Sequence, residues 1–281
     1  PLAVAGRSPA KAATTARPLG AAAARIDVFE SDPLSDLGFT PAAVVAAVNA
    51  PNDGLLLSSI RRSIPYVDIT RWTERLRDSA LRAAAAKPSA PVLFASSWMA
   101  GTAAMLAAHA AGRLDAVRAI DISVLYSMRD KAGPDSVEYM DRLAAPYPVT
   151  VDGSIRRTKP FTDPRTVTFP GRFHGKVYRF DTPDQVTLPA NTGARTVIAR
   201  IGFDSRGDTA MLAGLVRSGV WNLISGARFK TLRRKLLYNP GEGAPHEIVI
   251  DAFGSDAGGG GRRIRVGIAD PMGQTHLTAL G

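Results

Sequence analysis

One stretch constrains the fold of this chain more than any other: residues 44–70, VVAAVNAPNDGLLLSSIRRSIPYVDIT. It opens with an uncharged, valine-rich run at residues 44–48, which is typical of a parallel strand buried on both faces. Turn-forming residues at 49–54 end this run, and apolar residues then recur at helical spacing over 55–62. A second apolar run follows at 66–69. The stretch therefore predicts a strand–loop–helix–strand unit of a doubly wound α/β sheet.

The same alternation of strands and helices extends over the first third of the chain. The expected strands are residues 2–5, 25–28, 44–48, 66–69 and 91–95, and the expected helices are residues 9–17, 33–37, 55–62 and 73–87, with one more ending near residue 112. The window 92–111 is apolar but interrupted by serines, glycine and histidine, so it predicts strand, loop and helix rather than a membrane span. The first strand is expected to lie buried inside the sheet.

From about residue 119 the pattern changes to many short strands with few helices. The expected strands are residues 119–125, 149–153, 165–169, 175–180, 196–203, 247–253 and 262–268, and the expected helices are residues 134–144 and 209–218. The strand at 119–125 is expected to be half exposed, with Asp121 and Ser123 on its polar face. Four glycines at 258–261 predict a hairpin turn, because no helix follows them to make a phosphate site. This pattern predicts a mixed sheet packed on two or three helices.

The fold class expected is thus α/β: an incomplete Rossmann-type doubly wound parallel sheet, followed by a second α+β domain with a mixed sheet. The expected domains are residues 1–118, which bind the cofactor, and 119–269, which carry substrate contacts or a dimer interface. Residues 270–281 are expected to return towards the first domain.

Composition excludes several classes of site. The chain has no cysteine, which excludes disulfides and thiolate nucleophiles and fits a reducing compartment, so we expect a cytoplasmic protein. The 4 histidines are scattered without metal-ligand spacing, so no metal site is expected. We find no Ser-His-Asp order and no paired carboxylates that would indicate a hydrolase.

The net charge of +10 admits phosphate-bearing ligands, nucleic acid or an anionic membrane surface. Most of the basic residues are dispersed, and one cluster stands out: Arg228, Lys230, Arg233, Arg234 and Lys235. Such a run is most often a solvated helix face, and a membrane-surface or phosphate-binding patch is the alternative. We do not expect nucleic acid as a partner.

The residues after the first strand favour NADP over NAD. In a Rossmann half, the end of the second strand contacts the adenosine ribose; an acidic residue there favours NAD, and an arginine accommodates the 2′-phosphate of NADP. Here Arg7 and Ser8 follow the strand, Lys11 lies one helical turn on, and no acid is present. Ser8 also suits the N-cap of the expected helix, with Pro9 at its first position. An ordinary surface arginine is the alternative interpretation.

Several motifs resemble one family when taken in order. They are GRSPAK after an apolar strand, a strand ending in NAP, the PYVDIT strand, VLFASSWMAG before a helix, KPFTDPR, FPG, VTLP, and ADP followed by THLTA. Together they are similar to the saccharopine dehydrogenase-like NADP-binding family. The resemblance implies a Rossmann fold, NADP as the cofactor and hydride transfer, with cofactor contacts at Asn49, Ala50 and Pro51. Asn49 is expected either to hydrogen-bond the cofactor ribose or to be a plain turn residue. It also implies a small-molecule substrate and a possible homodimer.

The chain departs from that family at two places. The family begins with a strand and a glycine-rich GxGxxG turn that holds the pyrophosphate, and neither is present here. We therefore expect the sequence to be a fragment that starts late and stops early. In addition, Tyr66-Val67-Asp68 continues into Ile69-Thr70 where the family usually has Gly-Glu. Because that glutamate is absent here, an active-site role that depends on it is not carried over to this chain.

The candidate catalytic residues are Tyr66 and Asp68, which end a strand facing the expected cofactor crevice. A carboxylate there suits a general acid or the orientation of a substrate amine, and the alternative is a cap for the helix that follows. Trp98 and Met99 come after the next strand and are expected either to wall the nicotinamide pocket or to belong to the core. His174 lies among basic residues, and it is interpreted either as an ordinary surface residue or as an acid.

The sequence therefore predicts an oxidoreductase that transfers hydride between NADP(H) and an unidentified substrate, either an imine or amino acid or an unsaturated acyl compound. Two alternatives stay open. One is a non-catalytic interaction module that keeps the fold. The other is a basic protein that binds a membrane surface or nucleic acid through residues 228–235.

Overall fold

The computed structural model describes residues 1–50, 52–130, 142–143, 145–224, 229, 231 and 243–281. These residues form two compact units. The first unit comprises residues 1–70 and 77–94, and the second comprises residues 71–76 and 95–281. Each unit has its own sheets and core, and each is described by itself below.

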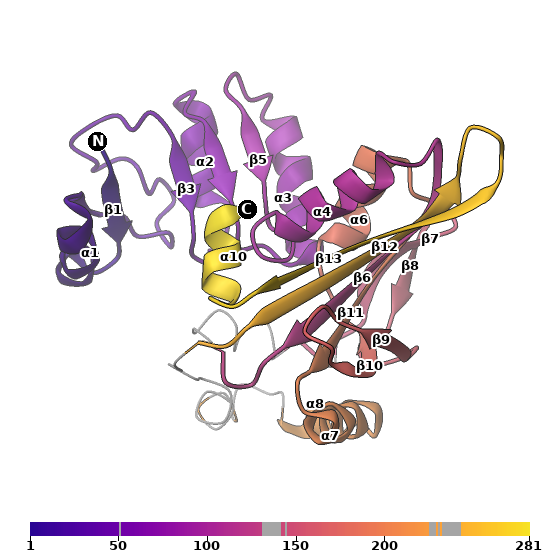
Figure 1. The fold of residues 1–281 in the computed structure, drawn as a ribbon. Coiled ribbons are helices and arrows are strands. Elements are labelled where there is room, and N and C mark those ends of the chain that lie inside the picture. Colours follow the sequence, from indigo (N-terminus) through magenta and orange to yellow (C-terminus); the bar gives the residue numbers. More distant parts are fainter. Residues whose placement is uncertain (51, 131–141, 144, 225–228, 230, 232–242) are drawn as a thin grey trace. The chain divides into compact units, whose positions relative to one another are not determined.

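The first unit contains the predicted strand–helix–strand unit. Strands β3 (Val44–Ala46), β4 (Tyr66–Asp68) and β5 (Val92–Phe94) pair in parallel in that order, with α2 (Gly54–Arg61) and α3 (Thr73–Ala85) between them in sequence (Figure 1). The core lies on the helical side of the sheet and contains Leu34, Val44, Ala46, Leu55, Leu56, Ile60, Ile64, Tyr66 and Ala83. The prediction from residues 44–70 is confirmed.

A second parallel pair belongs to the same unit. Strand β1 (Ala3–Gly6) pairs with β2 (Ala22–Arg25), and α1 (Pro9–Ala16) and a short 3-10 turn η1 (Arg17–Leu19) connect them. The expected burial of the first strand is wrong, because Ala5 is exposed and the rest of β1 is half-buried. Among the described residues only β2 pairs with β1, so one edge of the strand has no neighbour to cover it.

Two local predictions in the first unit are wrong for the same reason. The strand expected at 25–28 ends at Arg25, and the helix expected at 33–37 is a series of turns. In both segments the apolar residues that suggested regular structure pack against the core from a loop: Ile26 and Val28 do so after β2, and Leu34 is 4% exposed. Burial therefore produced an apolar pattern without a strand or helix.

The second unit is built on a six-stranded mixed sheet. Its order is β13-β12-β6-β11-β10-β9, with β6 (Ala116–Tyr126) parallel to β11 (Thr196–Phe203) and antiparallel to β12 (His246–Ser255). The remaining strands are β7 (Tyr147–Val151), β8 (Ser154–Thr158), β9 (Arg165–Thr168), β10 (His174–Arg179) and β13 (Gly261–Asp270). The helices are α4 (Thr102–Ala111), α6 (Asp184–Thr192), α7 (Arg206–Arg217), α8 (Val220–Ile224) and α10 (Gln274–Leu280). The predicted α/β class with a mixed second sheet is confirmed.

Both faces of this sheet are covered. Ile120, Ile122 and Val124 of β6 belong to the larger core, together with residues of α4 and α6. On the opposite face, Leu125 and Val249 pack with side chains from β9 and β10, so the sheet curls over itself. This curl explains a wrong prediction. Ser123, expected on an exposed polar face, is 1% exposed.

The curled face also contains a network of charges. Asp121 on β6 lies directly across from Asp251 on β12, an unfavourable pairing of like charges. Arg165 of β9 forms ion pairs with both carboxylates, and Arg200 pairs with Asp121 at 3.0 Å. The arginines compensate for the two adjacent carboxylates and connect the edge strand β9 to the centre of the sheet.

The long hairpin of β12 and β13 is clear in Figure 1. Its turn is formed by the glycine run, as predicted: the Asp256 carboxylate accepts hydrogen bonds from the N–H groups of Gly258 and Gly260, and Gly259 has φ of 79°.

Sequence patterns missed β8, α6 and α8; α6 contains Pro189, which argues against a helix. The helix expected at 134–144 and the basic cluster at 228–235 lie almost entirely outside the described residues. No helix in the described part of the chain is long and apolar enough to cross a membrane.

Candidate functional site

A hollow lies where β1 passes into α1. It has a volume of about 300 Å³ and is lined by Val4, Ala5, Gly6, Arg7, Ser8, Lys11, Ala12 and Thr15. Ser8 is the N-cap of α1: its hydroxyl oxygen accepts a hydrogen bond from the Lys11 N–H at 3.5 Å, and Pro9 occupies the first helical position. This cap and proline fix the direction in which the chain leaves the strand, as the sequence predicted.

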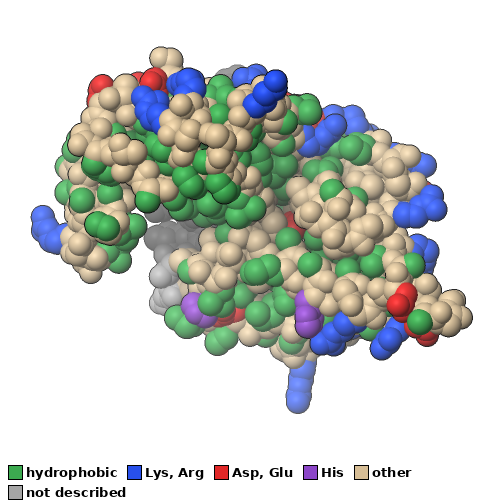
Figure 2. All heavy atoms as spheres, turned by 90° about the horizontal axis from the view of Figure 1, so that it is seen from above, with side chains coloured by type: hydrophobic (Ala, Val, Ile, Leu, Met, Phe, Trp, Pro, Cys, Tyr) green, Lys and Arg blue, Asp and Glu red, His purple; other side chains and the backbone are tan. Residues whose placement is uncertain are grey.

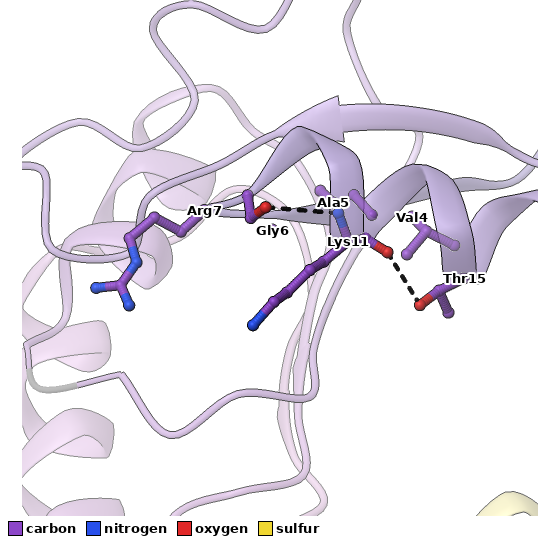
Figure 3. A pocket seen from close by; sticks show the side chains of 8 residues that line it. Val4, Ala5, Gly6, Arg7, Lys11 and Thr15 are labelled. Atoms are coloured by element: carbon purple, nitrogen blue, oxygen red, sulfur yellow. Dashed lines mark hydrogen bonds between the residues drawn. The ribbon is translucent and has the colours of Figure 1, made fainter.

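The charge in this hollow is entirely positive. The side chains of Arg7 and Lys11 are exposed and extend to the same side (Figure 3). Neither forms an ion pair with a described carboxylate, and the first turn of α1 contains no acidic residue. Because Pro9 has no N–H and Ser8 caps Lys11, the helix terminus itself offers few free donors. A bound anion would therefore contact two cations and the Ser8 hydroxyl.

Phe29 is a neighbour of this hollow that the sequence analysis missed. The Arg7 guanidinium lies 5.6 Å from the centre of the Phe29 ring, a cation–π distance, and the ring is 61% exposed. Phe29 follows β2, whose carboxyl end lies beside that of β1 because the two strands are parallel. The position of Phe29 after β2 could have indicated it, but the strand was predicted at 25–28 and ends at Arg25.

Tyr66 and Asp68 are together and buried. Each is 1% exposed, and the Tyr66 hydroxyl donates to Asp68 Oδ2 at 2.7 Å. The other carboxylate oxygen accepts from the Thr70 N–H at 3.0 Å and from the Thr70 hydroxyl at 3.1 Å. The Asp68 side chain thus stabilises the turn after β4. It does not cap α3, because that helix begins only at Thr73. A catalytic role for either residue stays a prediction.

The expected cofactor contacts Asn49, Ala50 and Pro51 follow β3. Asn49 is half-buried and Ala50 is 9% exposed, in the segment after the carboxyl end of that strand. Pro51 lies outside the described residues. The Thr70 hydroxyl donates to the Val48 carbonyl at 3.1 Å, so the segments after β3 and β4 are joined at this edge of the sheet. Asn49, Ala50 and Asp68 therefore lie at the edge where ligands of parallel sheets usually bind.

Residues 96–102, here called the Trp98 loop, belong to the second unit. The Trp98 indole packs edge-on against Phe180, with ring centres 4.9 Å apart, and its Nε1–H donates to His246 Nε2 at 2.9 Å. The Trp98 backbone N–H donates to Asp184 Oδ2 at 2.9 Å. Both Trp98 and Met99 are half-buried and pack against the larger core of the second unit.

His246 and Asp184 were not predicted, and both are fully buried. Burial lowers the pKa of His246 to about 4, opposed by the nearby Asp270 carboxylate, so the ring is neutral at neutral pH. Burial raises the pKa of Asp184, opposed by hydrogen bonds that include the one from the Trp98 N–H. No pattern in the sequence indicated this contact, since His246 is 148 residues from Trp98 and lies in an ordinary apolar strand pattern.

His174 lies elsewhere in the second unit. Its side chain is exposed, and its Nδ1 is 2.8 Å from the Thr168 hydroxyl. These contacts are those of a surface residue on the β9–β10 hairpin. No group of three or more His, Asp or Glu side chains in the described ranges could hold a metal ion.

Comparisons with known proteins give a likeness in structure but not in sequence. Neither the protein-family models nor the curated proteins that were searched give a match to the sequence. Among solved structures, apo saccharopine dehydrogenase (L-Glu forming) from Saccharomyces cerevisiae superposes with a TM-score of 0.62 and 13% identity. That alignment covers 99% of this chain and 82% of the yeast chain.

The chain is similar in fold to saccharopine dehydrogenase. Because the superposition spans nearly the whole chain, it covers both the parallel strands of the first unit and the mixed sheet of the second. Levoglucosan dehydrogenase aligns over 94% of this chain and 70% of its own at 12% identity, with a TM-score of 0.39. At 13% identity the likeness to the yeast enzyme shows the fold alone.

Proposed function

We propose that this protein is an NADP(H)-dependent oxidoreductase that transfers hydride between the nicotinamide and a small substrate with a C=N or an activated C=C bond. The observation that carries the proposal is the hollow formed by Arg7, Ser8 and Lys11 at the carboxyl end of a parallel strand. Its two cations and one hydroxyl match the needs of a phosphate monoester, which carries nearly two negative charges and three acceptor oxygens.

In this proposal the first unit holds the cofactor. Arg7, Ser8 and Lys11 bind the 2′-phosphate, and Phe29 lies beside Arg7 where the adenine would be expected. Asn49, Ala50 and Pro51 contact the cofactor beyond β3. An acidic residue in the place of Arg7 would repel the 2′-phosphate and accept hydrogen bonds from a free ribose, so the absence of an acid in the first turn of α1 supports NADP over NAD.

The chemistry of the proposal requires one proton as well as the hydride. When NADPH delivers hydride to the substrate carbon, the nitrogen of an imine, or the neighbouring alkene carbon of an unsaturated acyl compound, takes up a proton. Tyr66 is the proposed proton donor, and the Asp68 carboxylate, which accepts a hydrogen bond from the Tyr66 hydroxyl at 2.7 Å, is proposed to orient it. The fold of saccharopine dehydrogenase supports a dehydrogenase, and the substrate class stays open between imines and unsaturated acyl compounds.

Removing the two cations tests the cofactor assignment. Each charge-assisted hydrogen bond is worth about 1.5–3 kcal/mol, so the double variant Arg7→Ala, Lys11→Ala is expected to bind NADPH at least tenfold more weakly. NADH binding is expected to change little. Isothermal titration of both nucleotides measures this, using the protein together with any residues that precede Pro1 in its gene.

Arg17→Ala is the matched control, since Arg17 is another exposed cation that directly follows α1 but does not line the hollow. It is expected to bind both nucleotides as the unaltered protein does. Equal weakening of NADPH and NADH in the double variant would contradict the assignment, because it would indicate a general charge effect rather than recognition of the 2′-phosphate.

One observation favours a second candidate function, a non-catalytic interaction module that keeps the fold. Asp68 is 1% exposed and its carboxylate is engaged in a turn, so it has the contacts of a structural residue. Such a module would bind neither NADPH nor NADH, or would bind them without turnover. Measuring NADPH oxidation with a panel of imines, 2-oxo acids with amines, and enoyl esters separates the two candidates.

A further inference from the structure

Phe29 lies in a short turn of the first unit whose backbone is fixed by local hydrogen bonds. The turn spans residues 26–30, here called the Phe29 turn, and directly follows β2. The Phe29 N–H donates to Asp27 Oδ1 at 3.1 Å, and the Glu30 N–H donates to the Asp27 carbonyl at 3.1 Å. An aspartate that accepts from the backbone two residues on is a common way to hold a turn. The direction in which Phe29 leaves the chain is therefore set locally.

The Phe29 turn is also tied to the end of β1. The Ile26 N–H donates to the Gly6 carbonyl at 3.2 Å, directly before Arg7. Ile26 and Val28 pack against the core of the first unit, whereas Phe29 is 61% exposed. The apolar neighbours of Phe29 thus anchor the turn, and the ring of Phe29 is left outside the core, beside the Arg7 side chain.

The acidic residues of this turn are paired with another arginine. Arg25 lies 2.9 Å from Glu30 Oε1 and 3.9 Å from Asp27 Oδ2. Within the part of the chain that the structure describes, neither carboxylate forms an ion pair with Arg7. The positive charge of Arg7 is therefore not neutralised by the turn that contacts it, and the contact is made by the Phe29 ring instead.

The geometry of this contact suits an arginine that must bind an anion. The Arg7 guanidinium carbon lies over the Phe29 ring, 5.6 Å from its centre. A guanidinium is planar, so a contact through its face leaves the N–H donors at its edge free for phosphate oxygens. A long, exposed side chain without such a contact populates many rotamers, and ordering it on binding costs affinity. A stacked ring reduces that cost in advance.

We propose that Phe29 is a positioning residue that holds the Arg7 guanidinium at the hollow and thereby increases the discrimination between NADPH and NADH. The inference rests on the proposed function, in which Arg7 binds the 2′-phosphate. The competing role for Phe29 is a direct contact with the adenine. The two roles differ in their consequences, because the adenine is common to both nucleotides whereas the 2′-phosphate belongs to NADPH alone.

The test compares Phe29→Leu, which keeps an apolar side chain but removes the aromatic ring, with Phe29→Tyr, which keeps the ring. Isothermal titration of NADPH and NADH is made on the protein with any residues that precede Pro1 in its gene. Phe29→Leu should lower the ratio of NADPH to NADH affinity about two- to fivefold, and Phe29→Tyr should keep it. Phe39→Leu is the matched control, since Phe39 is another exposed phenylalanine of the first unit and does not line the hollow. If Phe29→Leu does not fold, Phe29→Gln is measured in its place.

A double-mutant cycle shows whether Phe29 acts through Arg7. In an Arg7→Ala background, Phe29→Leu should have no further effect on the affinity ratio. Three results would overturn the inference: an unchanged ratio in Phe29→Leu, equal weakening of both nucleotides, or the same loss of the ratio with and without Arg7. An Arg7→Ala variant that keeps the full preference for NADPH, or an unaltered protein that binds neither nucleotide, would instead overturn the proposed function.

Discussion

At the scale of single residues, two buried groups give this protein opposite responses to pH. Burial lowers the pKa of His246 from its ordinary 6.5 to about 4, so the folded state resists a proton that the unfolded chain accepts. Burial raises the pKa of Asp181 from 3.8 to about 6, opposed by hydrogen bonding from Thr73 and by Arg142. Below pH 6.5, acidification therefore removes stability through His246 and restores it through Asp181.

The two effects are expected to offset each other in the unaltered protein between pH 4 and 6.5 and to separate in variants. Each shift of about two pKa units corresponds to roughly 3 kcal/mol at most. His246→Gln should gain stability relative to the unaltered protein as the pH falls from 6.5 to 4. Asp181→Asn should gain relative stability as the pH rises from 4 to 6. Urea unfolding at half-unit steps of pH measures both, and parallel curves for all three proteins would contradict the assignments.

Also at the residue scale, the hollow of the first unit and the Trp98–His246 contact of the second unit differed in how far the sequence could predict them. Ser8, Pro9 and Lys11 lie within one turn of each other, so local rules for caps and helix starts were sufficient. The contact of Trp98 with His246 joins residues from a loop and a distant strand, and only the packing of the second sheet brings them together. A neutral histidine in an apolar strand has no pattern that predicts such a contact.

At the scale of elements, the sequence predicted regular segments well where burial and periodicity agreed. Strand β11 and helix α1 were predicted almost to the residue, because an apolar run and a cap mark their ends. The segments at 25–28 and 33–37 were wrong because loop residues can be as buried as those of a strand. The curl that buries Ser123 could not be predicted, since it depends on how β9 and β10 pack on the sheet rather than on their own sequences.

One glycine of the β12 strand tests the account of this sheet. The pairing of β12 with β6 shifts between Phe253 and Gly254, and a Cβ atom at Gly254 would lie 1.9 Å from the Ala116 carbonyl oxygen. Gly254→Ala must therefore push the two central strands apart, at an expected cost of about 2 kcal/mol or more. Gly261→Ala, in the same hairpin, has open space at its Cβ and is expected to change stability by less than about 0.5 kcal/mol. Denaturant unfolding of the pair measures this, and equal effects would contradict the close approach at the bulge.

At the scale of the whole molecule, the net charge of +10 favours an anionic ligand without specifying it. On the face seen in Figure 2, the Lys and Arg side chains are spread in separate groups rather than gathered in one patch. A dispersed charge attracts any nucleotide, whereas Arg7 and Lys11 line one hollow and are proposed to distinguish a 2′-phosphate from a hydroxyl. The proposed preference for NADP is therefore expected to originate at that hollow, and the net charge is expected to add a salt-dependent attraction to both nucleotides.

The most direct test of this account is a parallel titration of NADPH and NADH at two salt concentrations, on the protein with any residues that precede Pro1 in its gene. The account predicts that NADPH binds at least tenfold more tightly than NADH, and that this advantage narrows as salt is raised because the 2′-phosphate adds nearly two charges. Equal affinities for the two nucleotides, or tighter binding of NADH, would contradict it.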